Sequence, residues 1–164
     1  MTTQSDLRPV PFAVNEEVRG VAKDQLNGWL INLVALALRL KQAHWNMRGA
    51  RFKSVHEQLD EILVDVRAAV DDVAERVVTL GGIADGRPST VGRSMTLGDF
   101  PGGRLSVDDA IRECCQDIAA VVQGGRDVRA RLANSDPVSE DLVIGFLGKL
   151  EKHHWLLRSQ DELA

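Results

Sequence analysis

The stretch GGIADGRPSTVGRSMTLGDFPGGRL, residues 81–105, decides how the rest of the chain must be arranged. It holds seven glycines together with Pro88 and Pro101, a composition that interrupts regular structure. A connection of this length is too long for a simple turn between antiparallel neighbours. We therefore expect a long crossover, with one short helix near residues 89–95.

On both sides of this crossover the apolar residues recur at helical spacing. Two segments precede it, residues 15–47 and residues 52–80, and Gly49 supplies the break between them. Two more segments follow it, residues 106–132 and residues 136–160. The pattern predicts four long helices, arranged as two consecutive pairs.

The ends of these segments carry helix-capping signals. Asn15 is the predicted N-cap of the first helix, and glutamates fill the turn that follows it. Residues 54–57 match a capping box for the second helix, although an earlier start near residue 52 is also open, and Ser106 opens the third helix. Pro137 stands at a tolerated first-turn position of the fourth helix. The two glycines at positions 124–125 are expected to weaken the middle of the third helix.

Composition agrees with a helical fold. The 164 residues suit one domain, and only 4% of them are aromatic, with no tyrosine. β-Sandwiches and barrels draw more heavily on aromatic residues. Two helices, a long connection and two more helices describe a bundle with one crossover, which is the ferritin-like connectivity. We predict an all-α, ferritin-like four-helix bundle over residues 15–164, preceded by a short N-terminal arm at residues 1–14.

Charge and hydrophobicity restrict the possible partners and locations. The net charge of −4 opposes binding to nucleic-acid phosphates. The longest apolar run, residues 29–38, is interrupted by Asn32 and is too short to span a bilayer. The N-terminal residues lack the apolar core of a signal peptide. Adjacent Cys114 and Cys115 are predicted to be free thiols of a reducing compartment. We therefore expect a cytoplasmic protein that does not enter membranes.

Two pairs of metal-binding residue types lie on the second predicted helix. His56 and Asp60 are four residues apart, and so are Asp71 and Glu75, so each pair shares a helix face. Eleven residues separate Asp60 from Asp71, roughly three full turns, which places both pairs on one side of the helix. His56 and Asp71 are nevertheless separated by about 22 Å along the axis. The two pairs cannot bind one metal ion within a single chain.

His44 lies on the other side of the turn at Gly49. If the hairpin folds about residue 50, His44 is level with His56 on the adjacent antiparallel helix, and Asp60 is close to both. Two copies placed antiparallel about a two-fold axis would bring this group to the carboxylate pair of the other copy. Mixed imidazole and carboxylate ligands suit iron, and manganese or zinc less distinctively.

Simpler interpretations stay open from these residues alone. Acids at four-residue spacing are usually part of a solvated helix face. A single histidine is more often structural than a metal ligand. The chain would then be a plain structural bundle, or a bundle with an unrelated activity, because a fold does not determine a function.

Further short motifs accompany the five candidate ligands: KQAHWN at 41–46, HEQLD at 56–60, DDVAER at 71–76, LGG at 80–82 and LEKH at 150–153. With these motifs the chain resembles the Dps family, the DNA-binding proteins from starved cells, also called mini-ferritins. The resemblance covers about residues 15–161. The His-Trp-Asn element with the histidine and carboxylates downstream is highly specific.

The resemblance implies a four-helix subunit with a short crossover helix, assembled as a dodecameric shell. It implies ferroxidase centres shared between subunits, to which one subunit contributes His44, His56 and Asp60. The partner subunit contributes Asp71 and Glu75. The implied reaction oxidises ferrous to ferric iron, with hydrogen peroxide preferred over dioxygen, and the ferric product mineralises in the cavity.

Other residues have roles that the resemblance only outlines. Trp45 adjoins a predicted ligand and is expected either to donate an electron to a reactive intermediate or simply to pack. Asp136 and Glu140 fall near the negatively charged three-fold pores through which iron enters, although helix capping explains these acids equally well. His153 and His154 have no partner that spacing can assign, and we expect them to be structural or exposed.

The terminal segments depart from the family name. Members that bind DNA directly tend to carry flexible, lysine-rich arms, whereas residues 1–14 contain no lysine and only Arg8, and residues 159–164 are acidic. Twelve copies would form a strongly negative particle that repels phosphates. We predict weak or absent DNA binding and a main function in iron oxidation and storage that protects the cell and its DNA from oxidative damage. The alternative is a nucleoid-binding, DNA-protection protein with secondary iron binding.

Overall fold

The structure, a computed structural model, describes residues 12–161 of the chain. The N-terminal arm predicted at residues 1–14 lies outside the described residues, except for its last three positions. The elements follow one another in the order α1 (Glu16–Asn46), β1 (Met47–Arg48), α2 (Phe52–Thr79), α3 (Pro88–Ser94), β2 (Leu105–Ser106), α4 (Val107–Leu132) and α5 (Pro137–Arg158).

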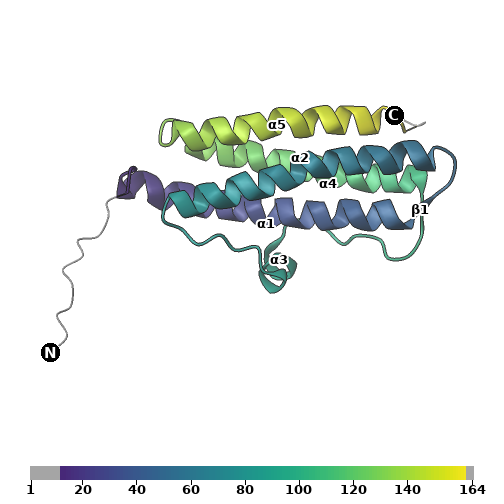
Figure 1. The fold of residues 1–164 in the computed structure, drawn as a ribbon, viewed down its shortest axis with the longest axis horizontal. Helices are drawn as coiled ribbons and strands as arrows, with labels where there is room; N and C mark the ends of the chain where they lie inside the picture. The colour runs from purple at the N-terminus through teal and green to yellow at the C-terminus, as the bar shows by residue number, and fades with distance from the viewer. Residues whose placement is uncertain (1–11, 162–164) are drawn as a thin grey trace.

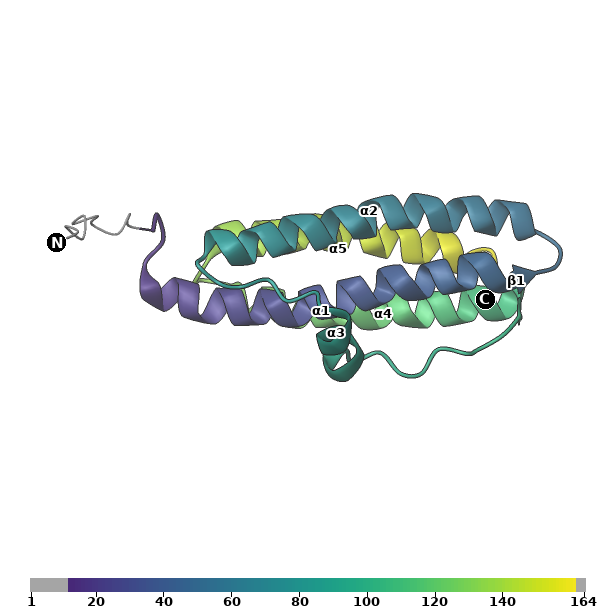
Figure 2. The same ribbon diagram turned by 60° about the horizontal axis from the view of Figure 1, so that its bottom comes forward.

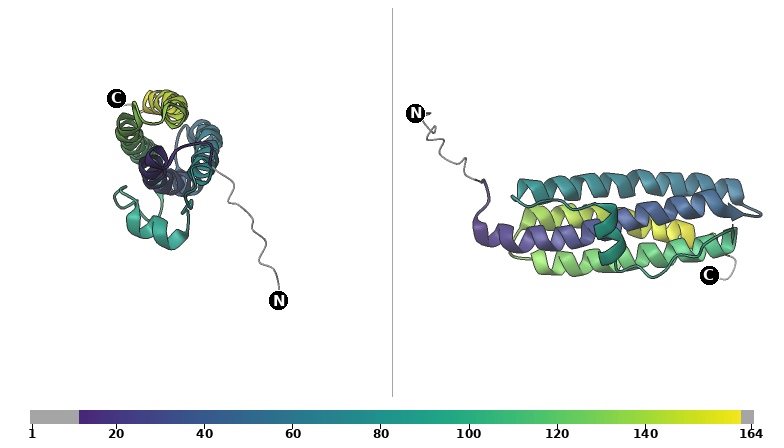
Figure 3. Two further views of the ribbon diagram at one scale, coloured as in Figure 1. Left: turned by 90° about the vertical axis from the view of Figure 1, so that its left-hand side faces the viewer. Right: turned by 90° about the horizontal axis from the view of Figure 1, so that it is seen from below.

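The four long helices run side by side, and α3 stands outside them against α1 (Figures 1 and 3). Helix α2 ends at the end of the bundle opposite to where α4 begins, so the connection must travel the length of the bundle (Figure 2). At its far end β2 pairs in parallel with β1, with Leu105 opposite Met47. The all-α, ferritin-like bundle with a short crossover helix is confirmed. Within residues 12–161, no helix combines the length and the apolar character that crossing a membrane requires.

Two of the predicted helix caps are present. The side-chain oxygen of Asn15 accepts a hydrogen bond of 3.0 Å from the backbone N–H of Val18 at the start of α1. The hydroxyl of Ser106 accepts one of 3.0 Å from the backbone N–H of Asp109 at the start of α4. Each cap satisfies a donor that the first turn of the helix leaves unpaired.

The second helix begins at Phe52, as the sequence predicts, and therefore earlier than the capping-box match at residues 54–57. No side chain caps its first turn, so these residues do not form the N-terminal cap. The chain instead turns through two left-handed positions, Gly49 with φ 129° and Arg51 with φ 65°. This tight entrance leaves little distance between the end of α1 and the first turn of α2.

The two glycines in the middle of α4 do not interrupt the helix, which is continuous from Val107 to Leu132. Because glycine has no side chain, they leave space for the ring of Trp29 on α1. The indole N–H of Trp29 donates a 3.0 Å hydrogen bond to the carbonyl of Val121. A Cβ atom at Gly125 would lie 2.8 Å from Leu147 and 2.9 Å from the Trp29 ring. The lower helix propensity of glycine is therefore offset by close packing of three helices.

Cys114 and Cys115 are free, buried thiols, as the sequence predicts. Burial raises the pKa of both thiols, that of Cys115 to about 11. Both side chains are therefore neutral near pH 7 and serve as core residues of α4.

A buried ion pair connects three segments of the bundle. The Arg39 guanidinium on α1 donates two hydrogen bonds, of 2.6 and 2.7 Å, to the two carboxylate oxygens of Asp117 on α4. A further N–H of Arg39 donates to the carbonyl of Gly98 in the crossover. Bidentate geometry and burial make this the kind of pair that is costly to break.

We expect Asp117→Asn to lower the free energy of unfolding by about 3 kcal/mol or more, because Arg39 would then be buried without its counter-charge. Glu151→Gln, which breaks the solvent-exposed pair with Arg126, is the control and is expected to cost less than about 1 kcal/mol. Urea unfolding of both variants measures the two effects. Equal losses would contradict the special role of the buried pair.

A second buried carboxylate ties the start of α5 to α2. Asp136 accepts hydrogen bonds of 3.0 and 2.9 Å from Arg76, and the Ser139 hydroxyl donates to it as well. Burial alone would raise the pKa of Asp136, but Ser139 and Arg76 outweigh burial and hold the pKa below its usual range. The ionised carboxylate thus stabilises the fold at pH values above the ordinary aspartate pKa of about 3.9, and this contribution is lost as pH falls through the lower folded-state pKa.

The free energy of unfolding should therefore drop below about pH 4 in the wild type, in part through Asp136. In Asp136→Asn, which cannot ionise at this position, the drop is expected to be shallower, from a lower starting stability at neutral pH. Urea unfolding at a series of pH values checks both slopes. Parallel pH profiles for the two proteins would show that Asp136 contributes nothing to acid sensitivity.

Candidate metal centre

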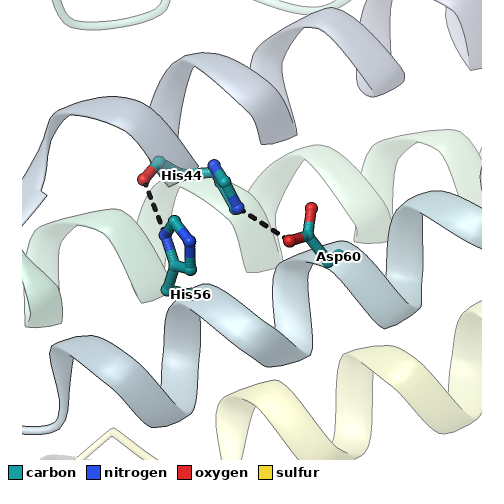
Figure 4. Close-up of side chains that lie close together, drawn as sticks. All are labelled: His44, His56 and Asp60. Atoms are coloured by element: carbon teal, nitrogen blue, oxygen red, sulfur yellow. Dashed lines mark hydrogen bonds and ion pairs between the residues drawn. The ribbon is translucent and has the colours of Figure 1, made fainter.

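The α1–α2 hairpin brings three metal-binding side chains together. His44 lies in the last turn of α1, and His56 and Asp60 lie in the first turns of α2 (Figure 4). One nitrogen or oxygen atom from each residue lies within 4.8 Å of the others. It is the short, left-handed entrance to α2 that sets His44 level with His56.

Hydrogen bonds orient both imidazole rings. The Nδ1 atom of His56 lies 3.2 Å from the carbonyl oxygen of His44, so Nδ1 donates a hydrogen bond to that oxygen and Nε2 is the ring nitrogen left for a metal ion. The two rings stack with centroids 3.6 Å apart. Such a backbone contact commonly fixes the tautomer of a metal-binding histidine.

His44 is buried, and its two ring nitrogens differ. Nε2 lies 3.0 Å from a carboxylate oxygen of Asp60 (Figure 4). Nδ1 is buried with no hydrogen-bond partner among the described residues. A buried polar atom without a partner is costly, and such atoms often mark functional positions.

Asp60 is shared between two cationic or donor groups. Its other carboxylate oxygen lies 2.5 Å from the ammonium nitrogen of Lys41 on α1 and forms an ion pair with it. Hydrogen bonds from Lys41 and then His44 lower the pKa of Asp60 to about 2. The side chain is half exposed, so it is an ionised and solvent-accessible ligand near neutral pH.

Asp71 and Glu75 do not join this group. Both are exposed on α2, and Asp71 follows Asp60 by eleven residues, about 16 Å along the helix axis. Among the described residues neither of these two carboxylates has an ion-pair partner within the chain. The five candidate residues therefore lie in two separate groups: His44, His56 and Asp60 near the start of α2, and Asp71 and Glu75 farther along it.

The remaining predicted residues are not members of the three-residue cluster. Trp45 is largely exposed at the end of α1. Asp136 is buried against Arg76, and Glu140 forms a 2.9 Å ion pair with Arg129. Both acids are thus compensated by arginine within the chain, and their role near a pore stays a prediction.

Two polar contacts were not anticipated from the sequence. The first is the ion pair between Lys41 and Asp60. Lys41 precedes His44 by three residues and lies on the same face of α1, so this spacing could have predicted that both residues contact Asp60. His153 on α5 pairs with Asp65 on α2 at 2.8 Å, and Lys149 pairs with the same carboxylate at 2.9 Å. No local spacing reveals this second contact, because it depends on how α2 and α5 face each other.

Known proteins are similar to this chain over most of its length. A family model described as ferritin-like domain matches residues 23–164. A DNA protection during starvation protein of Mycolicibacterium smegmatis is 34% identical over 155 residues, 94% of this chain and 84% of that protein. Another from Agrobacterium fabrum is 31% identical over 162 residues, 97% of this chain and 96% of that protein.

A solved structure, Dps from Microbacterium arborescens in the high iron form, is similar with a TM-score of 0.86 and 30% identity. The match covers 91% of this chain and 97% of that one. Sequence and fold therefore agree over nearly the whole chain. The chain belongs to the Dps family, within the ferritin-like superfamily.

Proposed function

We propose that this protein oxidises ferrous iron at a centre shared by two copies of the chain and stores the ferric product inside a dodecameric shell. One copy supplies His44, His56 and Asp60, and the other supplies Asp71 and Glu75. The observation that carries the proposal is the division of the ligands into two half-sites on one face of α2, one of them assembled by the α1–α2 hairpin.

The order of residues on α2 supports an antiparallel pair of copies. The position numbers of His56 and Glu75 add up to 131, and those of Asp60 and Asp71 do so too. A two-fold axis midway between positions 65 and 66 would therefore set each half-site level with the opposite half-site of the other copy. This register follows from the helix rise alone and requires no bending of α2.

Exposed apolar side chains support contact on the same side of the subunit. Leu38, Trp45 and Val64 are 63%, 68% and 71% exposed. Leu38 and Trp45 line one cleft with Arg67, which is three residues from Val64 on α2. Large apolar side chains gathered at one place are typical of a surface that another protein covers.

The donor set suits the proposed chemistry. Imidazole and carboxylate ligands bind iron, and carboxylates favour the harder ferric ion, so binding assists the loss of an electron. Iron is here the substrate. Hydrogen peroxide, the oxidant that we propose as preferred, accepts one electron from each of two ferrous ions, and the ferric ions then hydrolyse and mineralise. Consuming both reactants together prevents release of hydroxyl radical and so protects the cell and its DNA.

Further roles belong to the same proposal. Trp45, adjacent to His44 in sequence, is a candidate electron donor to a reactive intermediate. Asp136 and Glu140, at the start of α5, would lie near the acidic pores through which iron enters, with the charge of each offset by an arginine of the same chain. The protein would work in the cytoplasm.

The alternative function, compaction of the nucleoid, has one observation in its favour: the relatives from Mycolicibacterium smegmatis and Agrobacterium fabrum are named DNA protection during starvation proteins. Net charge argues against it, because each copy carries −4 and phosphate binding needs basic groups. We therefore propose weak or absent DNA binding, with protection of DNA arising from iron and peroxide removal.

We expect His56→Ala and the double variant Asp71→Ala/Glu75→Ala each to lower the rate of iron oxidation by about a hundredfold. Mutation of residues that only support the ligands of a metal site already lowers activity or metal affinity by roughly 10–100-fold. Coexpression of the two variants should restore activity. In a mixed dimer one centre combines the two unmutated half-sites and the other combines the two mutated ones. Random pairing makes about half of the dimers mixed, so about a quarter of all centres are intact. Absorbance of the ferric product, with peroxide and with air, measures the rates.

A centre built within one chain predicts no recovery on coexpression, and that outcome would defeat the shared site. Light scattering of every preparation provides the control, because it verifies that the particles have the mass of the proposed dodecamer. Lys53→Ala, which removes a cation from an exposed pair with Glu57 beside the site, is a matched surface variant and should keep wild-type rates.

In a gel-shift titration with duplex DNA, we expect retardation at low salt at most, and none near physiological salt. The physical reason is that an acidic particle releases few counter-ions from DNA. A complex that survives moderate salt would favour the nucleoid-binding alternative.

A further inference from the structure

Lys41 is the one cation that touches the three-residue cluster among the described residues. It lies one turn before His44 on α1, and its ammonium is 2.5 Å from one carboxylate oxygen of Asp60. The other oxygen of Asp60 faces His44 at 3.0 Å. Both oxygens that a metal ion would use are therefore already engaged by groups of the protein.

The helix backbone determines the direction in which the Lys41 side chain leaves α1. Residues three apart on a helix share a face, so a lysine at this position must point toward the neighbours of His44. The side chain is mostly buried, with 21% of its surface exposed. Its stem also lines a cleft of about 270 Å³ with Trp45 and Arg67, which leaves room for the ammonium to move away from Asp60.

From this contact we infer that Lys41 sets the metal affinity of the His44, His56 and Asp60 half-site, because an entering cation must displace its ammonium from Asp60. The inference rests on the proposed metal site and adds a residue that controls it. Two like charges cannot share one carboxylate without mutual repulsion, which is strong at a few ångströms in a partly buried place. Lys41 thus acts as a resident counter-charge and weakens binding of any divalent cation at this half-site.

The other half-site has no such competitor. Neither Asp71 nor Glu75 is paired with a cation among residues 12–161. Arg76, which follows Glu75 in sequence, is engaged by Asp136, and Arg67, one turn before Asp71, forms no ion pair with it among these residues. The two half-sites therefore differ in their electrostatics. The contact of an incoming cation with Asp60 should depend on the displacement of Lys41.

Calorimetric titration of the assembled protein tests this, with Zn²⁺ as a redox-inert probe and with Fe²⁺ in the absence of oxidant. Lys41→Met keeps the stem and removes the charge, and it should tighten binding by about tenfold or more. Lys41→Arg keeps the charge and should bind as the wild type does. Lys149→Met is the matched control, because Lys149 holds Asp65 in a similar pair elsewhere on α2.

A double-mutant cycle with Asp60→Asn separates direct competition from a general change in charge. Lys41→Met should have no effect once Asp60 is neutral. No tightening in Lys41→Met, or the same tightening in the Asp60→Asn background, would overturn the inference while wild-type binding leaves the proposed metal site intact. If neither wild type nor variant binds either metal, the proposed site fails, and the inference fails with it. Circular dichroism and light scattering verify the variants, and Lys41→Gln serves as a second charge-removing change.

Discussion

The rise of an α-helix, about 1.5 Å per residue, is the constraint on which the proposed chemistry depends. It fixes Asp60 and Asp71 on the same face of α2 and equally fixes them too far apart to share an ion. The hairpin at Gly49 and Arg51 adds His44 to one end only. In the proposed function each bundle presents two incomplete half-sites, and the geometry that separates them within a chain would align them between antiparallel copies.

Much of the fold was predictable because its signals are local. Helical periodicity and the caps at Asn15 and Ser106 gave the boundaries of the long helices closely, and glycine content marked the crossover. The level placement of His44 and His56 followed from counting residues on both sides of a tight turn. The capping box at residues 54–57 failed because a left-handed residue, Arg51, can begin a helix without any side-chain cap, and such a conformation has no sequence signature outside glycine and asparagine.

The contacts that the sequence did not reveal join helices that are distant along the chain. The pairs Arg39–Asp117 and His153–Asp65 depend on which faces of two helices meet, and periodicity leaves several facing arrangements open. The crossover illustrates the same limit. Its length was evident, but its anchoring to Arg39 through Gly98 required the packed structure. Lys41 was more accessible to prediction, since its spacing from His44 places both on one face.

The arrangement of α2 separates stability from chemistry. Its buried face supplies core residues such as Val55, Leu59 and Val66, whereas Asp71 and Glu75 are exposed and Asp60 is half exposed. Ionised carboxylates at such positions keep most of their hydration, so the fold does not depend on a bound metal to offset their burial. His44 is the exception, because it is buried and leaves one ring nitrogen unpaired. Apart from His44, the proposed ligands can therefore be replaced without disturbing the core of the bundle, so the proposed chemistry and the stability of the fold can be tested separately.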